Sequence, residues 1–272
     1  MDSITKLNLR RKKDTIECMK KTTIVVANWK MNPTTLREAK SIFLKIKKQT
    51  LKLKGIEIVV CPPAVYLSEL KRLSSGNKIF LGAQNCFNQV KGPWTGEISS
   101  AMLLTSGAKF VILGHSENRR AGDNDEIINQ KVKLALKSGM QVILCVGESR
   151  RDDEGNYFRL LKKQILDDLE GVSKNYLKNI LIAYEPLWAI GIKATGVITE
   201  KQLQEITIFI KKVLVDKYNV KDFKDVRILY GGSVSYKIVE DLIKTAVDGF
   251  LVGRDSLSQE KFDKLLKIIS SK

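Results

Sequence analysis

The stretch VILCVGESRRDDEGNYFRLLKKQILDDLEGVSKNYLKNILIAY (142–184) decides the fold class. It begins and ends with short, continuously apolar runs, Val142–Val146 and Leu181–Tyr184, which are typical of strands buried on both faces. Between them, Tyr157–Leu169 carries apolar side chains at the spacing of an amphipathic helix. A strand, a helix and a second strand in this order predict a βαβ unit with parallel strands.

The same alternation runs through the rest of the chain. Further helices are expected between the strands, for example over Leu36–Leu53 and Gln202–Val215. Eight such units in about 250 residues have the size of a closed (β/α)8 barrel, an α/β fold with eight parallel strands and outer helices. An open doubly wound sheet is the alternative, but the turn NWKMNPTT (28–35) after the first strand lacks glycine, which favours the barrel. The eight predicted strands are Ile24–Ala27, Glu57–Cys61, Ile79–Ala83, Phe110–Leu113, Val142–Val146, Leu181–Tyr184, Arg227–Tyr230 and Gly249–Val252.

Residues 1–20 differ from the rest of the chain. They carry six basic and three acidic side chains, and they lack the apolar segment of a secretory signal. We expect residues 1–20 to form a basic, disordered N-terminal extension, followed by one barrel domain over residues 21–272. Translation starting at Met19 would leave the same barrel.

The net charge of +17, from 47 Lys and Arg against 30 Asp and Glu, raises the question of an anionic partner. Lysines are spread over all the predicted helices and are not gathered with aromatic side chains, so we expect no nucleic-acid partner. No apolar run approaches the ~20 residues of a membrane span, so we expect no membrane partner.

The chain has one histidine and four cysteines, Cys18, Cys61, Cys86 and Cys145, without a CxxC pair. One histidine excludes a metal site that is built from several histidines. Cys61 and Cys145 end apolar runs, where small buried thiols are expected. This cysteine usage fits a reducing cytoplasm, which is the location that we predict.

Polar residues after the predicted strands are the candidates for a site, because active residues of a (β/α)8 barrel lie at the carboxyl ends of its strands. Taken singly, each has an ordinary structural role, such as a solvated lysine or a tight glycine turn. Their convergence on one rim indicates a site. They are Asn28 and Lys30 after the first strand, His115, Ser116 and Glu117 after the fourth, Glu185 after the sixth, and Gly231-Gly232-Ser233 and Gly253-Arg254 after the last two.

This set of groups suits proton transfer on an anionic carbonyl compound. Glu185 can take a proton from carbon, a neutral His115 can hydrogen-bond the carbonyl oxygen, and Lys30 can stabilise the developing negative charge. The glycine-rich loops after the last two strands suit a phosphate group, because backbone N–H groups can approach its oxygens there. The reaction requires no cofactor and no metal.

At these residues the chain resembles the triosephosphate isomerase family, from about residue 22 to the C-terminus. The resemblance implies a TIM barrel that interconverts dihydroxyacetone phosphate and D-glyceraldehyde 3-phosphate through an enediol(ate), in glycolysis and gluconeogenesis and without a cofactor. The motifs that carry it stand in the family's order: VANWKMN (26–32), GAQN (82–85), VILGHSE (111–117), CVGES (145–149), IAYEPLWAIG (182–191), LYGGSV (229–234) and DGFLVGR (248–254).

The resemblance implies a role for each matching residue. Glu185 would be the base that moves the proton between the two carbons, and His115 would act on the carbonyl and hydroxyl oxygens. Asn28 and Lys30 would hold the substrate and the transition state, while Glu117 would orient Lys30.

The resemblance also implies a phosphate site and a lid. Backbone N–H groups of Gly191, Ser233 and Gly253 would bind the phosphate, and Pro186-Leu187-Trp188 would be the first hinge of a lid that contains Gly191. Arg254 stands where many members have a second glycine. We expect its backbone N–H to keep the phosphate contact and its side chain to point away.

Two further departures from the family's pattern concern loops. In the lid, AIGIKATGV (189–197), Lys193 replaces a second glycine, and Ala194-Thr195-Gly196 occupies the second hinge. The segment NRRAGDNDE (118–126) is one residue shorter than usual. The loop KGPWTGE (91–97) resembles the one by which family members form homodimers, with Thr95 near Lys30 of the second copy.

Three other functions compete with this interpretation. A barrel isomerase or epimerase for larger sugars would usually need a metal or more acid–base residues than one histidine allows. A basic nucleic-acid-binding protein would gather its lysines on one face. An inactive relative would be expected to lack Lys30, His115 or Glu185, and all three are present.

Overall fold

The structure is a computed structural model, and it describes residues 22–74, 79–152, 154–190, 196–220 and 226–271. The predicted extension, residues 1–20, lies outside the described residues. None of the helices in the described part of the chain is long and apolar enough to cross a membrane.

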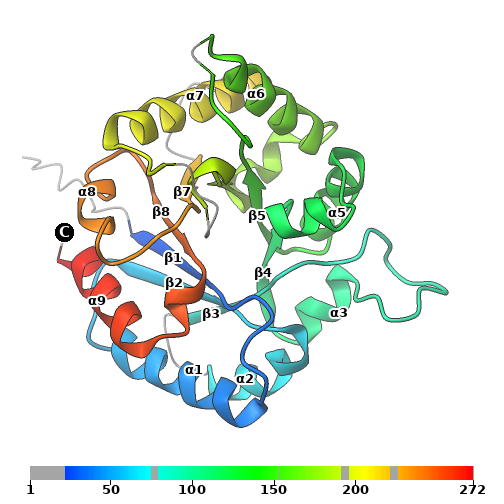
Figure 1. Ribbon diagram of the computed structural model, residues 1–272. Helices are drawn as coiled ribbons and strands as arrows, with labels where there is room; N and C mark the ends of the chain where they lie inside the picture. The colour runs from blue at the N-terminus through cyan, green and yellow to red at the C-terminus, as the bar shows by residue number, and fades with distance from the viewer. Residues whose placement is uncertain (1–21, 75–78, 153, 191–195, 221–225, 272) are drawn as a thin grey trace, which may run out of the picture.

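Eight strands form a closed barrel in chain order, each parallel to its two neighbours. Figure 1 looks along the axis of this barrel, with the strands at the centre and the helices in a ring around them. The predicted closed (β/α)8 barrel is therefore confirmed, and the open sheet is excluded. The strands are β1 (Thr23–Asn28), β2 (Ile56–Cys61), β3 (Ile79–Ala83), β4 (Ala108–Leu113), β5 (Gln141–Val146), β6 (Ile180–Tyr184), β7 (Arg227–Tyr230) and β8 (Gly249–Val252).

The α-helices of the described residues cover the outside of the barrel. They are α1 (Leu36–Thr50), α2 (Leu67–Leu73), α3 (Ser100–Thr105), α4 (Ser116–Arg120), α5 (Asp125–Lys137), α6 (Asn156–Asp168), α7 (Glu200–Tyr218), α8 (Val239–Leu242) and α9 (Gln259–Ser270). Short 3-10 helices lie at η1 (Ala64–Tyr66), η2 (Lys174–Asn179), η3 (Leu187–Ala189) and η5 (Arg254–Ser256).

Local sequence signals account for several helix boundaries. Thr199 begins α7 with a capping box, in which its hydroxyl accepts from the Gln202 N–H and the Gln202 side chain bonds back. Asn219 ends the same helix in the left-handed conformation. The helix predicted over Leu36–Leu53 ends at Thr50 instead, and the next residue, Leu51, is exposed.

The strands are buried on both faces, as their continuous apolar runs predict. One face fills the barrel interior with side chains such as Val26, Phe110, Ile143 and Leu229. The other face packs against the helices in a larger cluster. The barrel interior is thus a packed core and not an open channel.

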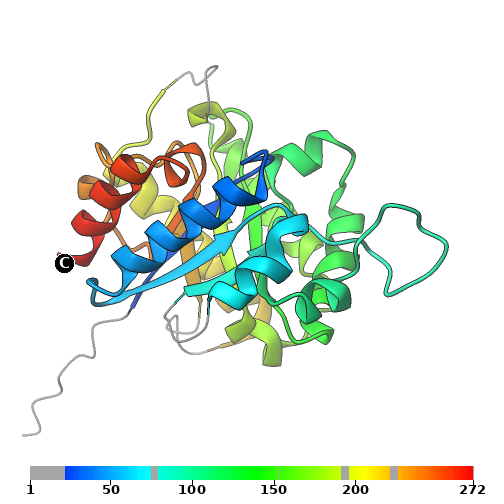
Figure 2. The same cartoon turned by 90° about the horizontal axis from the view of Figure 1, so that it is seen from below.

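One loop departs from this compact arrangement. The segment between β3 and α3 projects from the side of the barrel (Figures 1 and 2). Its two arms are joined where Phe87 N–H donates to the Ile98 carbonyl at 2.9 Å. The rings of Phe87 and Trp94 lie 5.2 Å apart, yet Trp94 remains about half exposed.

A buried ionic cluster ties together the helices α4, α5 and α6. Arg119, in α4, bonds Asp125 and Asp168, the latter at 2.6 Å. The Asp168 side chain is fully buried, and its Oδ1 has no partner among the described atoms. Burial, opposed by Arg119 and reinforced by Asp125, raises the pKa of Asp168 to about 8.

This pKa predicts a pH-dependent stability. The folded protein holds the Asp168 proton more tightly than the unfolded chain, whose ordinary value is 3.8. The contribution to stability is therefore complete at low pH and is lost as the pH rises to about 8. The quantity to compare is the unfolding free energy of the wild type minus that of Asp168→Asn. We expect this difference to decrease as the pH rises from 4 to 8, by up to about 1.4 kcal/mol per pH unit.

Denaturant unfolding at several pH values measures this difference. Asp167→Asn is the matched control, because Asp167 is the neighbouring, partly exposed carboxylate of the same helix. An equal decline for Asp167→Asn would show that the effect does not belong to Asp168. A difference for Asp168→Asn that is independent of pH would contradict the prediction.

Candidate active site

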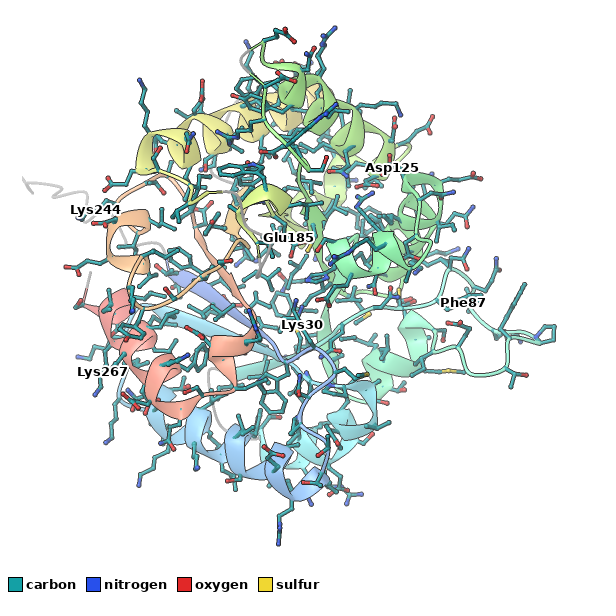
Figure 3. All side chains as sticks on the ribbon, in the orientation of Figure 1. Lys30, Phe87, Asp125, Glu185, Lys244 and Lys267 are labelled. Carbon is teal, nitrogen blue, oxygen red and sulfur yellow. The ribbon has the colours of Figure 1, made fainter. Side chains whose placement is uncertain are left out.

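The predicted site residues meet at the carboxyl ends of the strands. They surround a cavity of about 560 Å³. Figure 3 shows Lys30 and Glu185 close to the barrel axis, although they come from β1 and β6. The predicted residues that line the cavity are Asn28, Lys30, His115, Glu117, Glu185, Ser233, Gly253 and Arg254.

Lys30 is held from both its backbone and its side chain. Its φ of +53° is rare for a residue with a side chain, and its N–H donates to the Asn28 side-chain oxygen at 3.0 Å. Its carbonyl accepts from the Gln84 side chain at 2.8 Å. At the far end, Nζ bonds Glu117 Oε1 at 2.6 Å. Contacts from its own segment and from two others, which carry Gln84 and Glu117, therefore hold Lys30 at the cavity.

His115 is the N-cap of α4 and stands two residues after the end of β4. Its Nδ1 accepts a hydrogen bond from the Glu117 backbone N–H at 3.2 Å. A ring nitrogen that accepts carries no proton, so this contact selects the neutral tautomer with its proton on Nε2. Nε2 faces Glu185 Oε1 at 3.3 Å. The imidazole therefore presents an N–H to the cavity.

Glu185 follows β6 and is only 3% exposed. Its Oε2 accepts from the Ser116 N–H at 3.2 Å, and its Oε1 faces His115. Burial raises the pKa of Glu185, while His115, the Ser116 N–H and Lys30 act in the opposite direction. A buried carboxylate with a raised pKa is a stronger base than an exposed one, which suits it to proton abstraction.

Two loops without bulky side chains form the opposite wall of the cavity. The Gly231-Gly232-Ser233 loop follows β7, and Gly253 follows β8 and precedes η5. A Cβ on Gly231 would lie 3.0 Å from Glu185 Cγ, so glycine leaves room for the carboxylate. Ser233 Oγ donates to the Ala189 carbonyl at 2.9 Å, which connects this wall to η3.

The predicted lid is described only in part. Its first hinge, residues 186–188, runs into η3, and the Trp188 indole N–H donates to Glu148 Oε1 at 2.8 Å. Gly191, Lys193 and Ala194 lie outside the described residues. Gly196 is described, and a Cβ there would lie 3.4 Å from the Trp188 ring.

Ser116, one of the candidates after the fourth strand, acts through its backbone N–H, a group that every residue type carries. Two further residues belong to the site and were not among the candidates. Arg120 and Asp255 also line the cavity. Arg120 is the last residue of α4, and its Nε donates to the Ser116 carbonyl at 3.2 Å, one turn earlier in the same helix. Within the described residues, no group of three or more His, Cys, Asp or Glu side chains is placed to hold a metal ion.

Comparison with known proteins agrees with this geometry. The triosephosphate isomerase family model matches residues 23–269. The triosephosphate isomerase of Endomicrobium trichonymphae is 42% identical over 247 residues, which are 90% of this chain and 97% of that protein. The Alkaliphilus oremlandii triosephosphate isomerase is 40% identical over 88% of this chain and 96% of its own length.

A solved structure shares the fold as well. The crystal structure of triosephosphate isomerase from Bartonella henselae matches with a TM-score of 0.77 and 33% identity, over 91% of this chain and 98% of that one. The family model and the relatives span nearly all of the described barrel. The chain belongs to the triosephosphate isomerase family.

Proposed function

We propose that this protein interconverts dihydroxyacetone phosphate and D-glyceraldehyde 3-phosphate, as a step of glycolysis and gluconeogenesis. The observation that carries the proposal is the pairing of the buried Glu185 carboxylate with His115 Nε2, 3.3 Å apart, in a cavity that also holds the Lys30 ammonium. This pairing offers a base, a hydrogen-bond donor and a positive charge to a single small substrate.

The substrate phosphate would bind at the wall made by the glycine-rich loops. The backbone N–H groups of Ser233, Gly253 and Arg254 supply donors there, and Gly191 would add one from the lid. Glycine at 253 lets a phosphate oxygen approach the backbone closely. With the phosphate on this wall, the reacting carbons lie toward Glu185.

Chemistry then proceeds as two proton transfers at carbon, accompanied by the transfer of a proton between the two substrate oxygens. Glu185 removes a proton from the carbon next to the carbonyl, and the His115 N–H stabilises the oxygen on which negative charge develops. Lys30 lowers the energy of the resulting enediolate, while Asn28 and Glu117 keep Lys30 in place. His115 gives its Nε2 proton to the former carbonyl oxygen and recovers a proton from the hydroxyl on the first carbon, which becomes the new carbonyl. Glu185 returns its proton to the neighbouring carbon, so both side chains end in their starting protonation states.

Removing the base tests this assignment. We expect Glu185→Gln to lower kcat by about three orders of magnitude or more with little change in KM, because the carboxylate acts mainly in the transition state. The measurement is a coupled assay with glyceraldehyde 3-phosphate. Glu126→Gln, at an exposed glutamate that begins α5, is the matched control and should retain full activity. Activity of Glu185→Gln within tenfold of the wild type would remove Glu185 from this role.

The raised pKa of Glu185 gives a second test. Because the pKa lies above the ordinary value of 4.5, a larger fraction of Glu185 is protonated at a given acidic pH, and base catalysis is lost sooner on acidification. Carboxyl-carbon NMR of protein labelled on glutamate reports the titration directly, and the signal missing in Glu185→Gln identifies the residue. We expect a midpoint above 4.5. A midpoint at or below 4.5 would contradict the burial argument.

We infer that the protein acts as a homodimer through the projecting β3–α3 loop. The loop carries apolar side chains that are open to solvent in one copy, with Val90 56%, Trp94 49% and Ile98 39% exposed. Met31, beside Lys30, is 92% exposed. Apolar groups of this size gather at protein interfaces, and a second copy would bring Thr95 to Lys30.

Trp94→Asp tests the dimer. A buried, unpaired carboxylate would oppose association, so we expect the variant to be monomeric in sedimentation velocity and to have a lower kcat than the wild type. Leu160→Asp is the control, because Leu160 is as exposed as Val90 but lies on α6, away from the loop. A Trp94→Asp variant that sediments as the wild type does would overturn this interface.

We propose a cytoplasmic location for the enzyme. The described cysteines Cys61, Cys86 and Cys145 are free and buried, which suits a compartment in which thiols stay reduced. Both trioses are metabolites that such a compartment would supply.

A further inference from the structure

A second buried carboxylate lies one strand away from Glu185 and outside the substrate cavity. Glu148, two residues after β5, has a fully buried side chain. Its Oε1 accepts from the Tyr184 hydroxyl at 2.7 Å, from the Trp188 indole N–H at 2.8 Å and from Arg151 Nε at 3.1 Å. Its Oε2 has no partner among the described atoms.

Arg151 is the cation that faces this carboxylate. Besides its bond to Glu148, its Nη2 donates to the Tyr184 hydroxyl at 3.0 Å. Its guanidinium lies 4.8 Å from the centre of the Tyr157 ring and 5.1 Å from that of Trp188. The side chain is 15% exposed, so the charge is largely removed from water and its attraction to Glu148 is only weakly screened.

The partners of Arg151 flank the proposed base. Tyr184 immediately precedes Glu185, and Trp188 follows it by three residues. The backbones that follow β5 and β6 are also hydrogen-bonded to each other. The Glu185 N–H donates to the Val146 carbonyl at 2.8 Å, and the Leu187 N–H donates to the Glu148 carbonyl at 2.9 Å. A Cβ on Gly147 would lie 1.9 Å from the Glu185 carbonyl oxygen, so the segments are in contact without spare room.

We propose that Arg151 is a positioning residue for Glu185. Through its contacts with Glu148 and Trp188, Arg151 holds residues 184–188 in place. The proposal deepens the proposed function and rests on it. The buried Glu148 carboxylate is a strong acceptor for Tyr184 and Trp188 only while a cation balances its charge. Arg151 supplies that cation and also packs against the indole that it helps to orient.

Loss of Arg151 would leave Glu148 as a buried charge with neutral donors alone. Such a charge recruits water or moves, and either response releases Trp188 and shifts the segment that carries Glu185. Proton transfer depends steeply on the distance between base and carbon, so a small displacement costs rate. Substrate affinity depends chiefly on the phosphate loops after β7 and β8, which Arg151 does not touch in any described contact.

The first experiment compares Arg151→Gln with Arg150→Gln. Both variants remove one arginine, but Arg150 is exposed. We expect Arg151→Gln to lower kcat by about ten- to a hundredfold with KM within about threefold of the wild type, while Arg150→Gln leaves both unchanged. Arg151→Lys keeps the charge without the planar donor fork, so it should recover part of kcat. Should Arg151→Gln not fold, Arg151→Lys against Arg150→Lys carries the same comparison.

A double-mutant cycle tests the route of the effect. Trp188→Phe removes the indole N–H that binds Glu148, so the loss of kcat from Arg151→Gln should be at least threefold smaller in the Trp188→Phe background. If Arg151 only stabilised the fold, Arg151→Gln would lower the melting temperature, and its effect on kcat would be the same with and without Trp188→Phe. Equal losses in the two backgrounds, or equal kcat values for Arg151→Gln and Arg150→Gln, would overturn the proposal.

The outcome is distinguishable from a failure of the proposed function. If the wild type does not isomerise glyceraldehyde 3-phosphate, the function itself is wrong and Arg151 has no base to position. If the wild type is active and the Arg151 variants match their Arg150 controls, only the positioning role is wrong.

Discussion

The closure of the barrel, by pairing of β1 with both β2 and β8, is the constraint on which the site depends. The closing register sets Ile24 beside Gly249, where a Cβ would lie 1.9 Å from the Ile24 carbonyl oxygen, so only glycine permits the approach. A closed ring of parallel strands places all eight carboxyl ends on one rim. Residues as far apart in the chain as Lys30 and Glu117 thereby come within hydrogen-bonding distance.

The same architecture makes the rim a place where charge can be buried and used. Glu185 is almost fully enclosed, and the nearby His115 and the Ser116 N–H limit how far burial raises its pKa. Arg151 faces the buried Glu148, and Arg119 faces the buried Asp168. A buried carboxylate that lacks some of its hydrogen-bond partners lowers the stability of the fold. Such groups near an active site therefore indicate a role in function.

Much of the fold could be predicted because its signals are local. The eight apolar runs matched the strands to within two residues at each end, since strands covered on both faces are mostly apolar. The polar residues Glu57, Lys109, Gln141 and Arg227 lie at or near the strands' first residues. Helix ends were less accurate: α7 extends over Glu200–Tyr218, beyond the predicted Gln202–Val215, because the capping residues lie outside the periodic stripe. The place of Ser116 after the fourth strand made it a candidate, but the role of its backbone N–H could not be predicted. Arg151 acts through a partner distant in sequence, Tyr184, and leaves no local pattern.

By itself the sequence determined which chemical groups follow each strand, and that glycine follows the last two strands. Both depend only on the order of the strands in the chain and on the residue types between them. It also determined the family, through motifs in a characteristic order. Only the tertiary structure decided that His115 presents Nε2 to Glu185, and that Arg151 packs beside Trp188 behind the base. These are distances between separate elements, and they are set by the closure of the barrel and the packing of its ends.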